Sequence, residues 1–268
     1  MKKTLLLLAA LFLFCGTARV DAFDSKSGIR LTVLYDNTIA VDGVESDWGF
    51  SCLVEGLEKT ILFDAGTKPE IFARNVHALK VDLKKVDLVV ISHEHGDHTG
   101  GLPILFKVNA KLPVYHPVSF SQGFRDAVSK AGADTVPVTG PASICRDVYL
   151  TGEMGDAVKE QSLILRTAEG LVVITGCAHP GIVQILEKTK EILNEDIYLV
   201  FGGFHLQQQS AEAMVEIIKR FRELGVKKCG ATHCTGERQI EQFKQAYGED
   251  FVSIGVGNVL SFGKALTE

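Results

Sequence analysis

The chain has 268 residues, of which 46% are hydrophobic and 23% are charged. This composition is typical of a globular protein with a sizeable core and excludes a disordered chain. The formal net charge of -5 predicts no basic surface for nucleic-acid phosphates or anionic lipids. We therefore expect a small-molecule substrate, no nucleic-acid partner, and no membrane contact beyond the N-terminal segment.

The first 22 residues resemble a secretory signal peptide. Two lysines precede an apolar run, Leu5–Phe14, that is too short to span a bilayer, and small residues follow it. We expect cleavage after Ala22 or Ala18, export to the periplasm, and one mature domain over residues 23–268. An uncleaved membrane anchor is the alternative, which the short apolar run disfavours.

Five cysteines follow this segment, and export would place them in an oxidising compartment. No two of them have Cys-x-x-Cys spacing, and an odd number cannot all pair. We expect them mainly as small buried hydrophobic residues, with at most one disulfide. They are Cys52, Cys145, Cys177, Cys229 and Cys234.

Strand and helix patterns alternate along the rest of the chain. In the first half we predict a helix at residues 68–79 and strands at 29–35, 50–55, 60–63 and 86–92. In the second half three strands each lead through a turn into a helix: 171–175 into 182–193, 197–203 into 211–224, and 227–232 into 237–247. The chain closes on a β-like segment, 251–262. This alternation favours an α/β fold whose sheets are covered by helices.

The stretch "SHEHGDHTGG" places four candidate metal ligands where the strand 86–92 ends. His93 and His95 are two residues apart in an extended segment, so we expect both imidazoles on one side. Asp97 would continue this alternation, and His98 would follow at the turn. Imidazole and carboxylate groups suit zinc, iron or manganese, and four donors on one loop can serve two adjacent cations.

One loop cannot complete two coordination shells, so further ligands are needed. His179, His205 and His233 each follow a predicted strand in the second half. A lone histidine at a strand end is more often a hydrogen-bonded structural residue, but three at equivalent places favour a shared site. We expect packing roles for the neighbouring Cys177 and Cys234.

These motifs resemble those of a known family. "SHEHGDHTGG" resembles the His-x-His-x-Asp-His signature of the metallo-β-lactamase superfamily, and "ILFDAGT" resembles its upstream motif, in which Asp64 would be a supporting or structural carboxylate. "TGCAHPGIV", "GGFHL" and "THCTG" follow in the order seen in a subfamily similar to the dihydropterin synthases of methanopterin biosynthesis. The resemblance covers nearly all of the chain after residue 22 and implies a four-layer αββα sandwich.

The resemblance also implies two divalent metal ions, with Zn²⁺ the first choice and Fe or Mn the alternatives. It assigns the ligands as follows: His93, His95 and His179 to one metal, and Asp97, His98 and His233 to the other. The superfamily usually adds a bridging aspartate, or a cysteine in true β-lactamases, from the strand between His179 and His233, which here ends in "GGFHL". His205 stands near that position here, so we expect it either to bind a metal or to face the substrate.

These expectations favour a metal-dependent hydrolase. A metal-bound hydroxide, available because the ions lower the pKa of water toward ~7, would attack a small-molecule ester, lactone or phosphate, with Asp97 as the catalytic residue that orients it. Two alternatives stay open. One is a transferase that joins a pterin pyrophosphate to an aryl amine, against which the expected export argues. The other is a metal-binding or redox module without hydrolysis. We expect substrate choice to come from loops such as 36–48 and 117–141.

Overall fold

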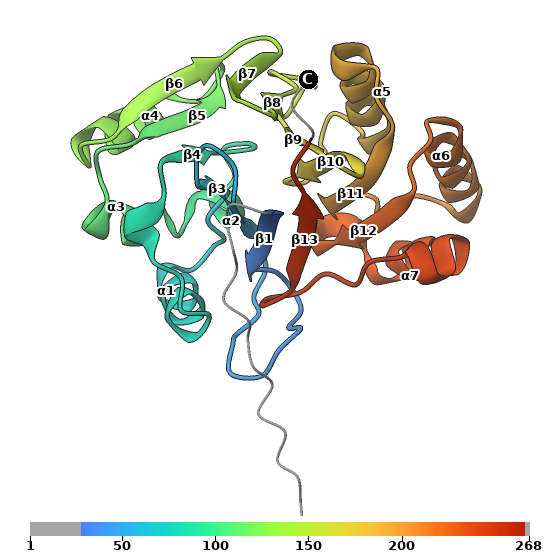
Figure 1. Ribbon diagram of the computed structural model, residues 1–268, viewed down its shortest axis with the longest axis horizontal. Coiled ribbons are helices and arrows are strands. Elements are labelled where there is room, and N and C mark those ends of the chain that lie inside the picture. The colour runs from blue at the N-terminus through green and yellow to red at the C-terminus, as the bar shows by residue number, and fades with distance from the viewer. Residues whose placement is uncertain (1–27, 266–268) are drawn as a thin grey trace, which may run out of the picture.

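Two β-sheets lie face to face between two layers of helices (Figure 1). This computed structural model describes residues 28–265. The arrangement confirms the predicted αββα sandwich.

The first sheet combines antiparallel and parallel pairs. Strands β13, β1, β2 and β3 pair antiparallel, whereas β3 to β6 pair in parallel. The spatial order is β13 (Val259–Gly263), β1 (Gly28–Tyr35), β2 (Ser51–Glu55), β3 (Ile61–Phe63), β4 (Leu88–Val90), β5 (Pro113–Pro117) and β6 (Asp134–Val138).

The second sheet has the same mixed character. Strands β12, β11 and β10 are parallel, and β9, β8 and β7 continue antiparallel. The spatial order is β12 (Lys228–Thr232), β11 (Ile197–Gly203), β10 (Gly170–Thr175), β9 (Leu163–Thr167), β8 (Val148–Leu150) and β7 (Ala142–Cys145).

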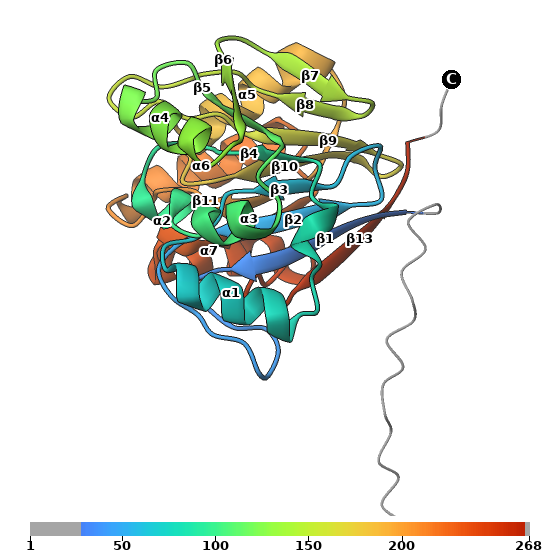
Figure 2. The same ribbon diagram turned by 90° about the vertical axis from the view of Figure 1, so that its left-hand side faces the viewer.

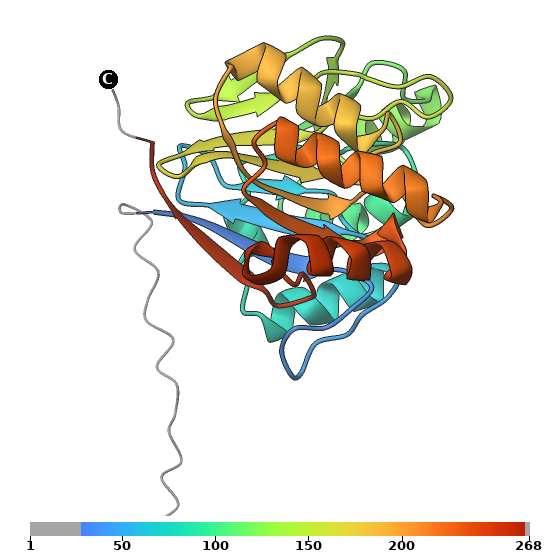
Figure 3. The same cartoon turned by 90° about the vertical axis from the view of Figure 1, so that its right-hand side faces the viewer.

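Each sheet has its own helical layer. Helices α1 (Pro69–Ala78), α3 (Leu102–Val108) and α4 (Gln122–Lys130) lie on the first sheet, and the short α2 (Gly96–Thr99) lies near them (Figure 2). Helices α5 (Ile182–Leu193), α6 (Ala211–Glu223) and α7 (Glu237–Tyr247) cover the second sheet (Figure 3). Three single turns of 3₁₀ helix complete the description: η1 (Leu83–Lys85), η2 (His233–Thr235) and η3 (Gly248–Asp250).

The apolar strands are buried on both faces, which explains their continuous hydrophobic runs. In β3, Ile61 and Phe63 join the core between the sheets, while Leu62 packs toward the helices. In β10, Val172 joins the core between the sheets and Val173 packs against the outer helices. The fold therefore has three apolar layers.

The sequence located most elements but missed part of the middle of the chain. The segment 117–141, expected to be a loop, contains α4 and β6. The closing segment 251–262 forms a strand only from Val259 onward. The expected alternation through Asp97 is wrong, because the backbone becomes helical at Gly96 and α2 carries both Asp97 and His98.

Burial of the cysteines is as expected, and no disulfide forms among the described residues. All five are free, and four are buried. Their burial agrees with the expected role as small hydrophobic side chains.

The predicted signal peptide requires a correction. Residues 1–22 lie outside the described range, and the structure of residues 28–265 gives no indication of such a segment. No helix within that range is long and apolar enough to cross a membrane. A short apolar run after two lysines does not by itself identify a signal peptide, because apolar runs of that length also occur in buried segments of globular proteins. The prediction of a signal peptide is therefore wrong.

Candidate metal centre

The histidine-rich loop is fixed against the turn that follows β3. The amide of Gly100 donates to the carbonyl of Gly66 at 2.8 Å, and the amide of Ala65 donates to the carbonyl of His98 at 2.7 Å. A Cβ at position 100 would overlap the carbonyl of Thr67, so only glycine allows this close approach. The loop therefore has a defined conformation before any ligand binds.

The structure brings all seven predicted ligands to the same end of the sandwich. Within each of three groups, the candidate ligand atoms lie within 4.8 Å of one another. We call them the first group (His93, His95 and His179), the second group (Asp97, His98, Cys177 and His233) and the thiol group (Cys177, His205 and Cys234).

The first group consists of imidazoles only. His93 Nε2 lies 3.0 Å from His95 Nδ1, and the ring of His179 is 4.8 Å from that of His93 between centroids. His93 is buried, whereas His95 is exposed. Nε2 of His179 is buried and has no hydrogen-bond partner among the described residues. An uncompensated nitrogen in this setting fits a metal ligand.

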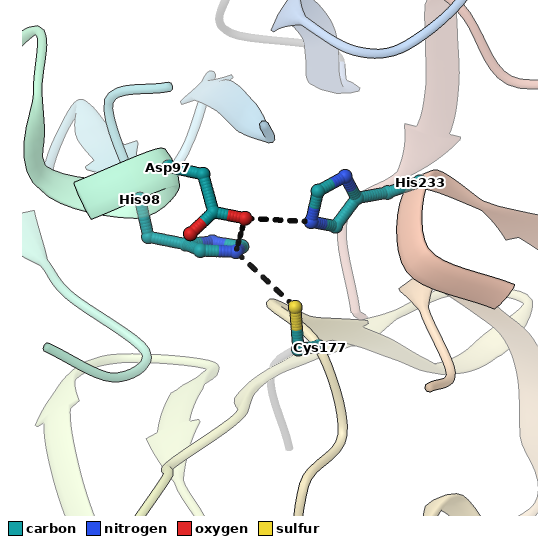
Figure 4. A group of neighbouring side chains, drawn as sticks. All are labelled: Asp97, His98, Cys177 and His233. Carbon is teal, nitrogen blue, oxygen red and sulfur yellow. Dashed lines mark hydrogen bonds and ion pairs between the residues drawn. The ribbon is translucent and has the colours of Figure 1, made fainter. Parts of the chain in front are cut away.

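The second group mixes oxygen, nitrogen and sulfur (Figure 4). Asp97 Oδ2 lies 3.5 Å from His98 Nε2 and 3.4 Å from His233 Nε2. Cys177 Sγ lies 3.3 Å from His98 Nε2. Nε2 of His233 is buried and has no hydrogen-bond partner in the described part of the chain. This donor set also fits a divalent cation of the zinc type.

Asp64 orients a histidine of each group. Its carboxylate accepts hydrogen bonds at 2.7 Å from His98 Nδ1 and from Ser92 Oγ, and Ser92 Oγ lies 2.9 Å from His93 Nδ1. Because Ser92 donates to Asp64, its oxygen is left to accept from His93. Both rings therefore carry a proton on Nδ1 and turn Nε2 toward the site.

Asn37 orients His233 in the same way. Its Oδ1 lies 2.9 Å from His233 Nδ1, and its Nδ2 donates to the carbonyl of His233 at 3.1 Å. The exposed ring of Trp48 lies 4.9 Å from the His233 ring between centroids. The loop 36–48 thus touches the second group directly.

A buried carboxylate shapes the turn between Cys177 and His179. Glu160 accepts hydrogen bonds from the backbone amides of Cys177, Ala178 and His179 at 2.8 to 3.0 Å. Burial raises the pKa of Glu160 to about 7, although these three bonds favour its charged form. Ala178 has a left-handed backbone, with φ 58°. The turn therefore directs Cys177 and His179 into different groups.

Left-handed backbone also occurs at three polar residues of the site. Asp64, His205 and His233 have φ of 53°, 51° and 51°. Such conformations are costly for residues other than glycine and persist where the surrounding structure enforces them. Here they point the side chains toward the centre of the site.

In the second group, the surroundings favour the charged form of Asp97 and the protonated form of His98. Burial would raise the pKa of Asp97, but the neighbouring His233 and His98 rings outweigh it and hold the pKa below its ordinary value. Burial also opposes a proton on His98, yet the adjacent Asp64 carboxylate raises the His98 pKa to about 10.

The first group disfavours protons. Burial, followed by the neighbouring imidazoles, lowers the pKa of His93 well below its ordinary value. Burial and the nearby His205 lower the pKa of His179 to about 4. Both rings are therefore neutral at physiological pH and can accept a cation.

His205 lies beside the first group but belongs to the thiol group. Its exposed ring is 4.3 Å from that of His179 between centroids, and a hydrogen bond with Cys234 raises its pKa. It is absent from both the first and the second group. The His205 side chain thus lies beside the first group but is a ligand candidate only in the thiol group.

Sequence reasoning missed Cys177 as a member of the second group and missed Glu160 altogether. Cys177 was given a packing role, although its even spacing from His179 was a signal. Glu160 lies in no recognisable motif, so only the fold reveals its contact with the turn. Glu94, between two candidate ligands, instead accepts a 2.6 Å hydrogen bond from the amide of Ser121.

Comparisons with known proteins agree with this geometry. The 7,8-dihydropterin-6-methyl-4-(beta-D-ribofuranosyl)-aminobenzene-5'-phosphate synthase of Methanocaldococcus jannaschii is 30% identical, over 81% of this chain and 90% of that protein. The crystal structure of Tm1679, described as a metal-dependent hydrolase of the beta-lactamase superfamily, has a TM-score of 0.77 and 31% identity, and the match covers 88% of this chain and 100% of that one.

A more distant structure shares the fold. The metallo-beta-lactamase fold protein YhfI of Bacillus subtilis has a TM-score of 0.65 at 16% identity, over 87% of this chain and 99% of that one. The sequence model of the metallo-beta-lactamase superfamily matches residues 49–182, which include the histidine-rich loop and the first group. The chain therefore belongs to the metallo-beta-lactamase superfamily.

Proposed function

We propose that this protein is a hydrolase of small-molecule esters, lactones or phosphates that uses two divalent cations, with zinc the leading choice. The observation that carries the proposal is the pair of adjacent donor groups, in which Asp64 and Asn37 orient the histidine nitrogens before any metal is present. The described hydrolase activity of Tm1679, which is 31% identical, supports it.

The ligands in this proposal are those of the two groups. His93, His95 and His179 would hold one ion, and Asp97, His98 and His233 would hold the other. Bound ions would lower the pKa of a water molecule and polarise the electrophilic centre. The protein itself orients the ligands through Asp64 and Asn37, and it provides the Asp97 carboxylate next to the bound water.

Asp97 has the position of an orienting residue. Its Oδ2 lies between His98 and His233, and its side chain is 16% exposed, so substrate or water can reach it. Its depressed pKa keeps it ionised at neutral pH. An ionised carboxylate here can accept a hydrogen bond from the attacking water and hold it in line.

A hydrolysis screen tests the proposal. Protein with its native metals would be incubated with phosphate esters, lactones, thioesters and β-lactams, before and after chelation and after zinc is restored. We expect hydrolysis of at least one class, lost on chelation and regained with zinc. Hydrolysis that survives complete metal removal would refute the proposal.

A transferase is the second candidate, and two observations favour it. The synthase of Methanocaldococcus jannaschii is 30% identical over most of both chains. The exposed Trp48 beside His233 also offers a flat face on which an aromatic substrate such as a pterin can stack. Incubation with a pterin pyrophosphate and aryl amines, followed by mass spectrometry, distinguishes the candidates: the coupled product indicates the transferase, and a free pterin alcohol indicates hydrolysis.

A further inference from the structure

The second group contains a sulfur atom in place of the expected bridging carboxylate. The superfamily resemblance places that carboxylate on the strand between His179 and His233, which here is β11 with its end at Gly203. The residues after β11 carry no aspartate or glutamate up to Glu212, which lies in α6. The structure must therefore complete the second group by other means.

Gly203 leaves no room for a side chain. A Cβ at this position would lie 2.7 Å from Cys234 Sγ and 3.0 Å from His233 Cδ2, and it would overlap the carbonyl of Gly176. His205, two residues later, has its ring against that of His179. The end of β11 thus cannot supply a ligand to the second group.

The neighbouring strand β10 supplies one instead. Cys177 follows β10, is 3% exposed, and has its amide fixed by Glu160 Oε1 at 3.0 Å. Its Sγ lies 3.3 Å from His98 Nε2 in the same group as Asp97 and His233 (Figure 4). An independent sign of a missing ligand is Nε2 of His233, which is buried without a hydrogen-bond partner in the described range.

Three of the six separations within the second group are close to the edges of a tetrahedron around a metal, and all six are at most 4.8 Å. Bonds of about 2.0–2.1 Å to nitrogen and oxygen and about 2.3 Å to sulfur imply edges of about 3.3–3.6 Å. The observed distances are 3.4 and 3.5 Å from Asp97 Oδ2 to the two histidine nitrogens and 3.3 Å from Cys177 Sγ to His98 Nε2. The two oxygen to nitrogen distances exceed the usual length of a hydrogen bond, about 2.7–3.2 Å.

We propose that Cys177 is a thiolate ligand of the metal in the second group, together with Asp97, His98 and His233. This inference rests on the proposed two-metal function. On binding, the Cys177 thiol loses its proton to solvent and the sulfur lone pair forms the bond to the cation. The second site then prefers cations that accept sulfur, such as Zn²⁺ or Co²⁺, over Mn²⁺, while the first site has imidazoles only.

Cobalt substitution tests this assignment without an activity assay. Metal-free protein would be titrated with Co²⁺, and absorption would be followed in the visible, where bound Co²⁺ absorbs, and in the near ultraviolet, where thiolate-to-cobalt charge transfer appears. We expect both in the wild type. Cys177→Ala and Cys177→Ser should lose the near-ultraviolet band and keep visible absorption from the first group.

Two further variants control the result. Cys229→Ala removes a buried cysteine of β12 that belongs to none of the three groups, and it should keep the charge-transfer band. Cys234→Ala should also keep it. Circular dichroism would confirm that each variant is folded.

Zinc binding gives a second readout. In Cys177→Ala we expect the affinity of the second group for zinc to fall by more than the roughly 10–100-fold that is typical of losing a residue that only hydrogen-bonds to a metal ligand.

The outcomes separate the two proposals. Visible cobalt absorption without a charge-transfer band in the wild type, or a band that survives in Cys177→Ala, would overturn the role of Cys177 and leave the two-metal function standing. A band lost only in Cys234→Ala would do the same and move the ligand to Cys234. No cobalt absorption in the folded wild type would instead refute the metal centre itself.

Discussion

The first and second groups lie side by side but differ in burial, chemistry and protonation. The first has three imidazoles, of which His95 is exposed and His93 and His179 have lowered pKa values. The second combines a carboxylate, two imidazoles and a thiol, and its His98 has a raised pKa. The first group is therefore ready to accept a cation, whereas the second must release protons before it can do so.

The two groups also share one support. Asp64 contacts His98 of the second group directly and reaches His93 of the first through Ser92. Asn37, in contrast, contacts one candidate ligand, His233, and otherwise accepts a hydrogen bond from the amide of Gly49. A substitution of Asp64 should therefore affect both groups, whereas a substitution of Asn37 should affect the second group alone.

Asp97→Asn should have the largest effect. The amide keeps the shape of the side chain but removes the charge that faces His98 and His233, so kcat should fall about 10²–10⁴-fold, the range typical of losing a positioned acid or base. Steady-state kinetics on the substrate found by screening would measure it. Glu94→Gln, on the same loop but bonded to Ser121, is the matched control and should stay near wild type. An unchanged kcat in Asp97→Asn would remove Asp97 from the mechanism.

Asp64→Ala should weaken both groups together. Loss of a partner that orients ligands typically reduces metal affinity about 10–100-fold. The change also leaves His98 without its buried partner, so the free energy of unfolding should fall by about 3–5 kcal/mol. Competition titrations with a chelator and urea unfolding would measure these effects. Ser51→Ala, which removes only a hydrogen bond to the Asp64 backbone carbonyl, should leave metal affinity unchanged.

The pH dependence should separate the groups. His179 has a pKa of about 4 and His98 a pKa of about 10, so at about pH 5.5 His179 is neutral whereas His98 still holds a proton that a metal must displace. We expect zinc to fill the first group first at that pH. Because His98 and the proposed ligand Cys177 each release a proton on binding, the metal affinity of the second group should rise by up to about a hundredfold per pH unit while both are protonated.

The same proton affects the stability of the metal-free protein. The His98 pKa is raised on folding, so its contribution is complete below the unfolded value of about 6.5 and is lost as pH rises through about 10. The difference in unfolding free energy between wild type and His98→Gln should shrink over that range. A difference that grows with pH would contradict the assigned protonation.

Asn37→Ala should have the smallest effect of these changes and should affect only the second group. The variant loses the hydrogen bond that fixes the His233 ring, so we expect about tenfold weaker binding of one metal and no change in the other. Calorimetric titration that resolves two binding events would show this. Equal weakening of both events would mean that the groups are not independent.

The sequence predicted the elements whose patterns are local. Strands such as β3 and β10 are continuous apolar runs, and α5 has an apolar stripe, so their positions follow from periodicity. The middle of the chain has short strands and helices with mixed polarity, and its elements depend on tertiary packing. The segment 117–141 was expected to be a loop for this reason.

The site was predicted to the level of its ligands but not of its geometry. The alternation rule that placed His93 and His95 together assumes an extended backbone. It fails at Asp97, which lies in α2, and at Ala178, whose left-handed backbone separates Cys177 from His179. Neither conformation has a local sequence signal, so the even spacing of Cys177 from His179 did not by itself show that Cys177 joins the second group.

The number of zinc ions per chain tests the central claim most directly. Elemental analysis after dialysis against zinc would compare the wild type with His95→Ala, which alters only the first group, and with His233→Ala, which alters only the second. We predict two ions in the wild type and one in each folded variant. A wild type with fewer than two ions, or variants that both retain two, would contradict the assignment of two separate metal sites to these groups.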